Sequence, residues 1–83
     1  MVIRVAIIED DPILAGRFAD AINAATGMMV VNRANSVASG SGLIDAEGYD
    51  VLLCDLGLPD GDGTTLIAKE AAKGRGTDIL VIT

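Results

Sequence analysis

The chain of 83 residues contains four apolar runs, from which its architecture is predicted. They cover residues 2–8, 28–34, 51–54 and 79–82, and the first is rich in β-branched side chains. Runs that lack polar alternation are typical of strands buried on both faces of a parallel sheet. The second run turns polar at Asn32, which indicates a strand at the edge of that sheet.

Three segments between these runs are predicted to be helices. The first follows Pro12, has Asp11 near its N-cap, and carries apolar side chains at positions 14, 18, 22 and 25 along one face. The second is expected to run from a cap at Ser36 to about residue 47. Its glycines at positions 40 and 42 weaken it by about 1 kcal/mol each relative to alanine, so we expect it to be the least stable helix.

The third helix is predicted over residues 64–73, with Asp62 as its candidate cap and the breaker Gly74-Arg75-Gly76 after it. The resulting order is βαβαβαβ. Helices that alternate with buried strands predict one α/β domain with a parallel sheet and right-handed crossovers.

The composition narrows the classes of function. Twelve acidic and six basic residues give a net charge of −6. This balance argues against nucleic-acid binding by this segment, because phosphate contacts need clustered cations. Histidine-based metal and catalytic sites are excluded, since the sequence contains no histidine.

Two further features bear on location. Cys54 is the only cysteine and is interpreted as a small buried hydrophobe in a reducing compartment, which favours the cytoplasm. Arg4 interrupts the first apolar run, and no run approaches the ~20 residues of a membrane helix. Neither a signal peptide nor a membrane span is therefore expected.

The candidate reactive and metal-binding side chains lie where the predicted strands end. Glu9 and Asp10 follow the first strand, Asp55 follows the third, and Thr83 follows the fourth. Because ligands of open parallel sheets sit beyond the carboxyl ends of the strands, we expect these side chains to share one edge. Three neighbouring carboxylates repel one another unless a cation lies between them, and hard oxygen ligands favour Mg²⁺ or Mn²⁺. A carboxylate beside such an ion suits Asp55 as a nucleophile toward phosphorus, with Thr83 bonding a phosphoryl oxygen.

Three segments resemble the receiver domain of two-component response regulators. They are residues 5–12 (VAIIEDDP), 50–63 (DVLLCDLGLPDGDG) and 79–83 (ILVIT). The resemblance implies a flavodoxin-like fold with strand order 2-1-3-4 and a phosphoryl group accepted from a histidine kinase or phosphotransfer protein. The second segment looks most like regulators that carry a C-terminal helix-turn-helix domain and control transcription.

The resemblance also implies residue roles. Asp55 is the phosphoacceptor and Thr83 the switch hydroxyl. Asp10 and the backbone carbonyl of Gly57 are metal ligands, and Glu9 acts through a metal-bound water.

Residues 1–83 match only the first two-thirds of a receiver, so the chain resembles a truncated one. The resemblance implies a fifth strand, which supplies a lysine to the phosphoryl group, and two more helices. Without them, phosphorylation is expected to be impaired. The apolar fourth strand becomes an edge, so we expect a dimer or a domain-swapped oligomer through residues 78–83.

Two other functions compete with a phosphoaccepting module. The first is an aspartate-nucleophile phosphatase or phosphotransferase, but families of that kind place a second acid two residues after the nucleophile, where this chain has Gly57. The second is an interaction fragment that oligomerises and retains only a vestigial site. The prediction is therefore a regulatory protein that is not an enzyme beyond its own phosphorylation and dephosphorylation.

Overall fold

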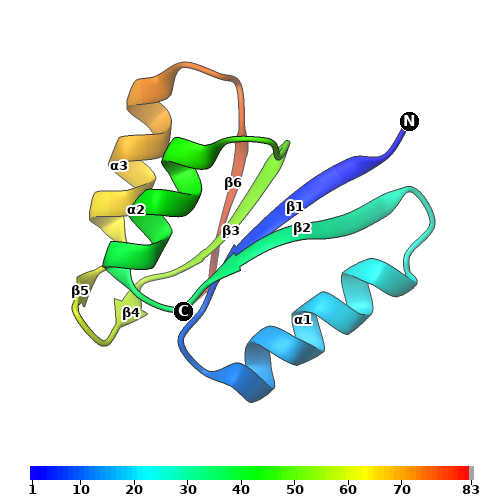
Figure 1. The fold of residues 1–83 in the computed structure, drawn as a ribbon, viewed down its shortest axis with the longest axis horizontal. Coiled ribbons are helices and arrows are strands. Elements are labelled where there is room, and N and C mark those ends of the chain that lie inside the picture. Colours follow the sequence, from blue (N-terminus) through cyan, green and yellow to red (C-terminus); the bar gives the residue numbers. More distant parts are fainter. Residues whose placement is uncertain (83) are drawn as a thin grey trace.

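The computed structural model describes residues 1–82 as a twisted sheet with helices on both faces (Figure 1). Its elements in chain order are β1 (Ile3–Ile8), α1 (Pro12–Ala24), β2 (Met28–Ala34), α2 (Val37–Ala46), β3 (Val51–Asp55), β4 (Gly57–Leu58), β5 (Gly61–Asp62), α3 (Thr64–Lys73) and β6 (Asp78–Ile82). All four predicted strands and all three predicted helices are confirmed, with ends shifted by one or two residues. No helix in this part of the chain is both long and apolar enough to cross a membrane.

The four long strands form one parallel sheet in the order β2-β1-β3-β6, as predicted. Ile8 pairs with Ala34 on one side and with Cys54 on the other, while Asp55 pairs with Ile82. The ends of β1, β3 and β6 are therefore level with one another. This register brings the residues that follow β1 and end β3 to the same edge of the sheet.

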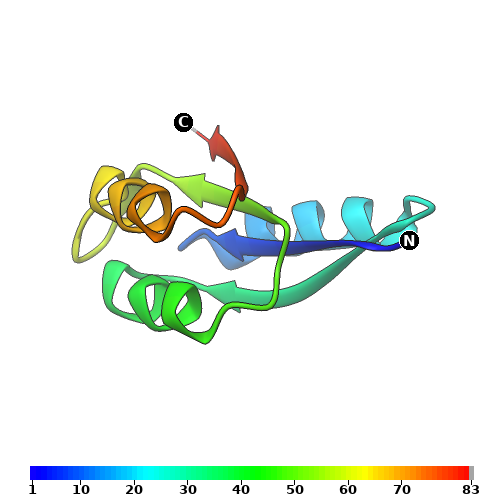
Figure 2. The same cartoon turned by 90° about the horizontal axis from the view of Figure 1, so that it is seen from above.

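The helices divide the core into two layers. Helix α1 covers one face of the sheet, and α2 and α3 lie side by side on the other (Figures 1 and 2). Alternate residues of β1 serve the two layers: Val5 and Ile7 pack with Ala19 of α1, whereas Ile8 packs with Ile44 of α2 and with Leu66 of α3. Burial of both strand faces explains why the sequence of β1 shows no polar alternation.

Gly40 lets α2 come close to its neighbours. A Cβ atom at this position would lie 2.7 Å from Cδ1 of Leu66 and 3.1 Å from Cδ1 of Ile8. The sequence prediction counted Gly40 only as a helix-weakening residue. The absence of a side chain also lets α2 pack closely against α3 and the sheet. Gly40 therefore costs helix propensity but permits this close packing.

The helix caps agree in part with the sequence prediction. The Asp11 carboxylate accepts hydrogen bonds from the amides of Ile13 and Leu14, and Ser36 caps α2. For α3 the cap position is Gly63 rather than Asp62. Asp62 still accepts a hydrogen bond at 2.9 Å from the Thr64 amide.

A buried ion pair links α3 to the start of β3, at the edge opposite the carboxyl ends. Glu70 is 2% exposed and accepts hydrogen bonds from the Tyr49 hydroxyl and from Nη2 of Arg75 at 2.9 Å. Arg75 also donates to the carbonyl of Ile44 at 3.2 Å and pairs with Glu47 at 2.9 Å. From the sequence, Glu70 was assigned only to the α3 helix and Arg75 only to the breaker after it.

Candidate metal and phosphoacceptor site

Three carboxylates meet at the carboxyl edge of the sheet. Glu9 and Asp10 follow β1, and Asp55 is the last residue of β3. Each of the three offers a carboxylate oxygen, and these oxygens lie within 4.8 Å of one another. The clustering predicted for Glu9, Asp10 and Asp55 is thus confirmed, and we call these three residues the acid cluster.

The electrostatics of the acid cluster favour a bound cation. Glu9 is only 4% exposed, and burial, followed by its contact with Asp55, raises its pKa to about 7. The Asp11 amide donates to Glu9 at 3.3 Å and opposes this shift. Within residues 1–82, no lysine or arginine forms an ion pair with any of the three acids. A divalent ion with oxygen ligands would supply the missing positive charge.

Neither lysine of the chain reaches this site. Lys69 and Lys73 both bind Asp45 on α2, at 3.0 and 3.2 Å. Both ammonium groups are therefore held on α2, away from the place of the lysine that the resemblance implies. In the described residues, the acid cluster therefore has carboxylates but no cationic side chain.

The segment after Asp55 is a small hairpin, which the sequence analysis missed. Residues 57–62 form the antiparallel strands β4 and β5 around the turn Pro59-Asp60. The Gly57 amide donates to Oδ1 of Asp55 at 3.1 Å, so the hairpin starts against the phosphoacceptor candidate. Leu58 and Gly61 pair across the two turn residues, which is the spacing of a tight hairpin, but the glycines and Pro59 of this segment are equally typical of an irregular loop.

Gly63 closes this hairpin against β3. Its amide donates to the Leu56 carbonyl at 2.9 Å, and an added Cβ would lie 2.1 Å from the Asp55 carbonyl oxygen. Only glycine fits so close an approach of two backbone segments.

The remaining candidates are Thr83, Gly57 and Cys54. Thr83 lies outside the described residues, so its role as switch hydroxyl stays a prediction. Gly57 lies beside Asp55, but the role of its carbonyl as a metal ligand also stays a prediction. Cys54 is fully buried, and burial raises the pKa of its thiol to about 11, which supports the interpretation as an inert hydrophobe.

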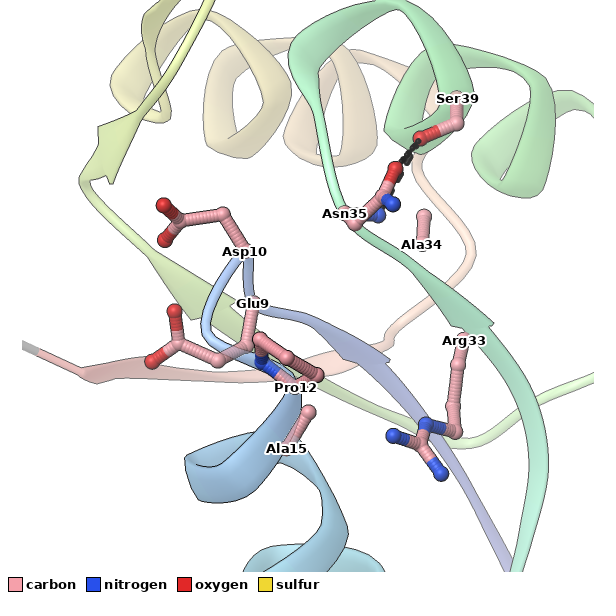
Figure 3. A pocket seen from close by; sticks show the side chains of 8 residues that line it. All are labelled: Glu9, Asp10, Pro12, Ala15, Arg33, Ala34, Asn35 and Ser39. Atoms are coloured by element: carbon pink, nitrogen blue, oxygen red, sulfur yellow. Dashed lines mark hydrogen bonds between the residues drawn. The ribbon is translucent and has the colours of Figure 1, made fainter.

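An open pocket of about 360 Å³ adjoins the acid cluster (Figure 3). It is lined by Glu9, Asp10, Pro12, Ala15, Arg33, Ala34, Asn35 and Ser39. Figure 3 shows the carboxylates of Glu9 and Asp10 directed away from Arg33, and Asp55 is not among the lining residues. The pocket therefore borders the acid cluster but does not contain the position where all three carboxylates meet.

Comparisons with protein families and with curated proteins both find similarity to response regulators. A family model described as the response regulator receiver domain matches residues 5–83. The probable C4-dicarboxylate response regulator DctR of Priestia megaterium is 30% identical over 79 residues, which are 95% of this chain and 35% of the relative. The chain thus spans about a third of the length of this curated relative.

Solved structures share the fold. The MaeR response regulator bound to beryllium trifluoride has a TM-score of 0.87 at 20% identity, with 99% of this chain and 67% of that chain covered. The receiver domain of the putative response regulator NarL from Mycobacterium tuberculosis has a TM-score of 0.86 at 28% identity, with 96% and 64% covered. ChrA, from a heme-sensing two-component system, has a TM-score of 0.83 at 32% identity, with 99% and 38% covered.

Proposed function

Because this chain belongs to the response regulator receiver domain family, we propose that it is a phosphoacceptor module of a two-component phosphorelay, with Asp55 as the Mg²⁺-dependent acceptor. The observation that carries this proposal is the acid cluster, whose three oxygens lie within 4.8 Å of one another. The cluster combines a candidate nucleophile with the hard ligands that Mg²⁺ takes.

Four groups of this chain would hold the ion: the carboxylates of Asp10 and Asp55, the carbonyl of Gly57, and Glu9 through a water. When bound, Mg²⁺ neutralises negative charge on the transferring phosphoryl group. This donor set fits Mg²⁺ or Mn²⁺, because every ligand is oxygen and none is sulfur or nitrogen.

The chemical step is a transfer to a carboxylate oxygen. One oxygen of Asp55 forms a bond to phosphorus while the bond from phosphorus to the donor's leaving atom breaks, and the electron pair departs with the donor. The Gly57 amide, 3.1 Å from Oδ1 of Asp55, holds that oxygen in place and leaves the other free to react. The donor is a phosphohistidine of a histidine kinase or phosphotransfer protein, or a small acyl phosphate.

The role is regulatory rather than that of a substrate-turning enzyme. We place the chain in the cytoplasm, where its phosphorylation controls an output such as transcription. An aspartate-nucleophile phosphatase is the less favoured alternative, because the position two residues after Asp55 is Gly57, which has no side chain to act as general acid.

The test is incubation of the chain with Mg²⁺ and a small acyl phosphate, followed by intact-mass measurement and peptide mapping. We expect one phosphoryl adduct, on Asp55, formed slowly because no cationic side chain reaches the acid cluster in residues 1–82. Chelation of the metal should prevent the adduct. Absence of any adduct over hours would contradict the proposal, and turnover of a phosphate ester would favour the phosphatase.

Self-association through β6 is a second proposal, which rests on the exposure of this strand. β6 is the edge strand of the sheet among the described residues, with Leu80 55% and Val81 50% exposed. An exposed apolar edge pairs readily with another strand. We expect sedimentation of the 83-residue chain across a dilution series to show a dimer or a larger species; a compact monomer at micromolar concentration would contradict this.

A further inference from the structure

The hairpin of residues 57–62 is fixed to the rest of the molecule at two places. At its base, Gly63 closes on β3 and Leu58 is 8% exposed in the core. At its tip, the Asp60 carboxylate reaches the first turn of α2, beside which the hairpin lies in Figure 1. The base is held further by Asp62, which accepts hydrogen bonds at 2.9 Å from the Thr64 amide and from the Thr65 hydroxyl of α3. The contact of Asp60 ties the tip of the hairpin to α2.

The tip contact uses both oxygens of Asp60. Oδ1 accepts a hydrogen bond at 2.6 Å from the Val37 amide, and Oδ2 accepts one at 3.0 Å from the Ala38 amide. These two bonds lower the pKa of Asp60, as expected of a carboxylate at a helix N-terminus. Asp60 is separated from its partners by 22 and 23 positions, so this is a tertiary contact and not a local cap.

The two remaining free amides at the start of α2, those of Ser36 and Ser39, are capped locally. The Ser36 hydroxyl accepts from the Ser39 amide at 3.0 Å, and the Ser39 hydroxyl accepts from the Ser36 amide at 3.1 Å. Asp60 therefore takes the two amides that this capping box leaves over. On the surface, water could satisfy those amides, so the special effect of Asp60 is to fix the hairpin.

We infer that Asp60 is a positioning residue, which ties the hairpin to α2 and thereby holds Gly57 beside Asp55 in the geometry that the metal and phosphoacceptor site needs. The inference deepens the proposed function and rests on it. Two residues separate the Asp60 carboxylate from Gly57, whose amide bonds Asp55 at 3.1 Å. Loss of the tip contact frees the turn and lets Gly57 move relative to the acid cluster.

The test compares Asp60→Ala with the matched control Ser36→Ala, which removes a cap of the same helix without touching the hairpin. Two quantities are measured on the 83-residue chain: the hydrogen-exchange rate of the Gly57 amide by NMR in chelator, and the Mg²⁺ affinity by calorimetry. For Asp60→Ala we expect faster exchange at Gly57 and a Mg²⁺ affinity about tenfold lower, as for other groups that orient metal ligands. For Ser36→Ala both should stay near the parent values although thermal stability falls.

Asp60→Asn guards against misfolding of the alanine variant. Its amide side chain offers one acceptor oxygen to α2, so exchange at Gly57 should be intermediate. Equal effects of Asp60→Ala and Ser36→Ala, or an unchanged Gly57 amide in Asp60→Ala, would overturn the inference. If the parent chain itself binds no Mg²⁺, the proposed function fails, and the Gly57 exchange rates alone decide the role of Asp60.

Discussion

Asp55→Asn is expected to abolish the phosphoryl adduct and to lower the Mg²⁺ affinity at least tenfold. The asparagine amide is too weak a nucleophile to displace the donor, and the site loses one of its three carboxylates. Intact-mass measurement after incubation with acyl phosphate and calorimetric titration with Mg²⁺ provide the two readouts.

The fold should tolerate this substitution. A carboxylate oxygen of Asp55 lies within 4.8 Å of one from Glu9 and one from Asp10. Without a cation these three carboxylates repel one another. The free energy of unfolding in chelator should therefore be unchanged or higher in Asp55→Asn.

Asp62→Asn is the matched control, since it removes one carboxylate charge from the hairpin that follows Asp55. Asparagine can still accept the bond from the Thr64 amide, which measures 2.9 Å with Asp62. This variant should keep both the adduct and the Mg²⁺ affinity. Unchanged Mg²⁺ affinity in Asp55→Asn, or an adduct of the same yield, would place the site elsewhere.

Arg75→Ala is expected to cause the largest loss of stability. The substitution leaves the Glu70 carboxylate, which is 2% exposed, without its cation. Breaking a buried ion pair in this way costs about 3 kcal/mol. Since a small domain has only about 5–15 kcal/mol in total, urea denaturation followed by circular dichroism should show a large shift of the midpoint.

The pH dependence of this loss identifies its cause. Burial tends to raise the pKa of Glu70, but the bonds from Tyr49 and Arg75 outweigh it, so the pKa is lowered. In the parent chain this contribution to stability is present at neutral pH and is lost as pH falls through the lowered pKa. Without Arg75, burial raises the pKa of Glu70, so protonation of Glu70 stabilises the folded variant. The cost of Arg75→Ala should therefore grow between about pH 4 and pH 7.

Arg4→Ala is the control for the loss of one arginine. Arg4 pairs with Asp50 at 3.1 Å, but the two side chains are 48% and 38% exposed, so water replaces the lost partner. Its midpoint should shift much less than that of Arg75→Ala. Adding Glu70→Gln to Arg75→Ala should recover part of the loss, because the buried charge is then gone. Equal shifts for Arg4→Ala and Arg75→Ala would show that Glu70 does not depend on Arg75.

The acid cluster was predictable because its geometry follows from strand ends. Residues 5–8 before Glu9 and residues 51–54 before Asp55 are uninterrupted apolar runs, and they form neighbouring parallel strands whose carboxyl ends coincide. The position of Asp55 depends on where its strand ends and on little else. The strand order, in contrast, was implied by the resemblance to receiver domains and not by the apolar runs themselves.

The contacts of Asp60, Glu70 and Gly40 were not predictable in this way. Asp60 caps a helix 22 positions away, Glu70 is bonded by Tyr49 from 21 positions away, and Gly40 fits against Leu66. No local pattern distinguishes such an acid from a solvated one, or such a glycine from a helix breaker.

The sequence alone therefore determined the four long strands, the three helices and the meeting of Glu9 with Asp55, because burial of apolar runs acts through local periodicity. Only the tertiary structure decided which polar groups of different helices and loops form hydrogen bonds with one another. A hydrogen bond requires its two atoms to lie within about 3 Å, and that distance is set by how whole elements pack.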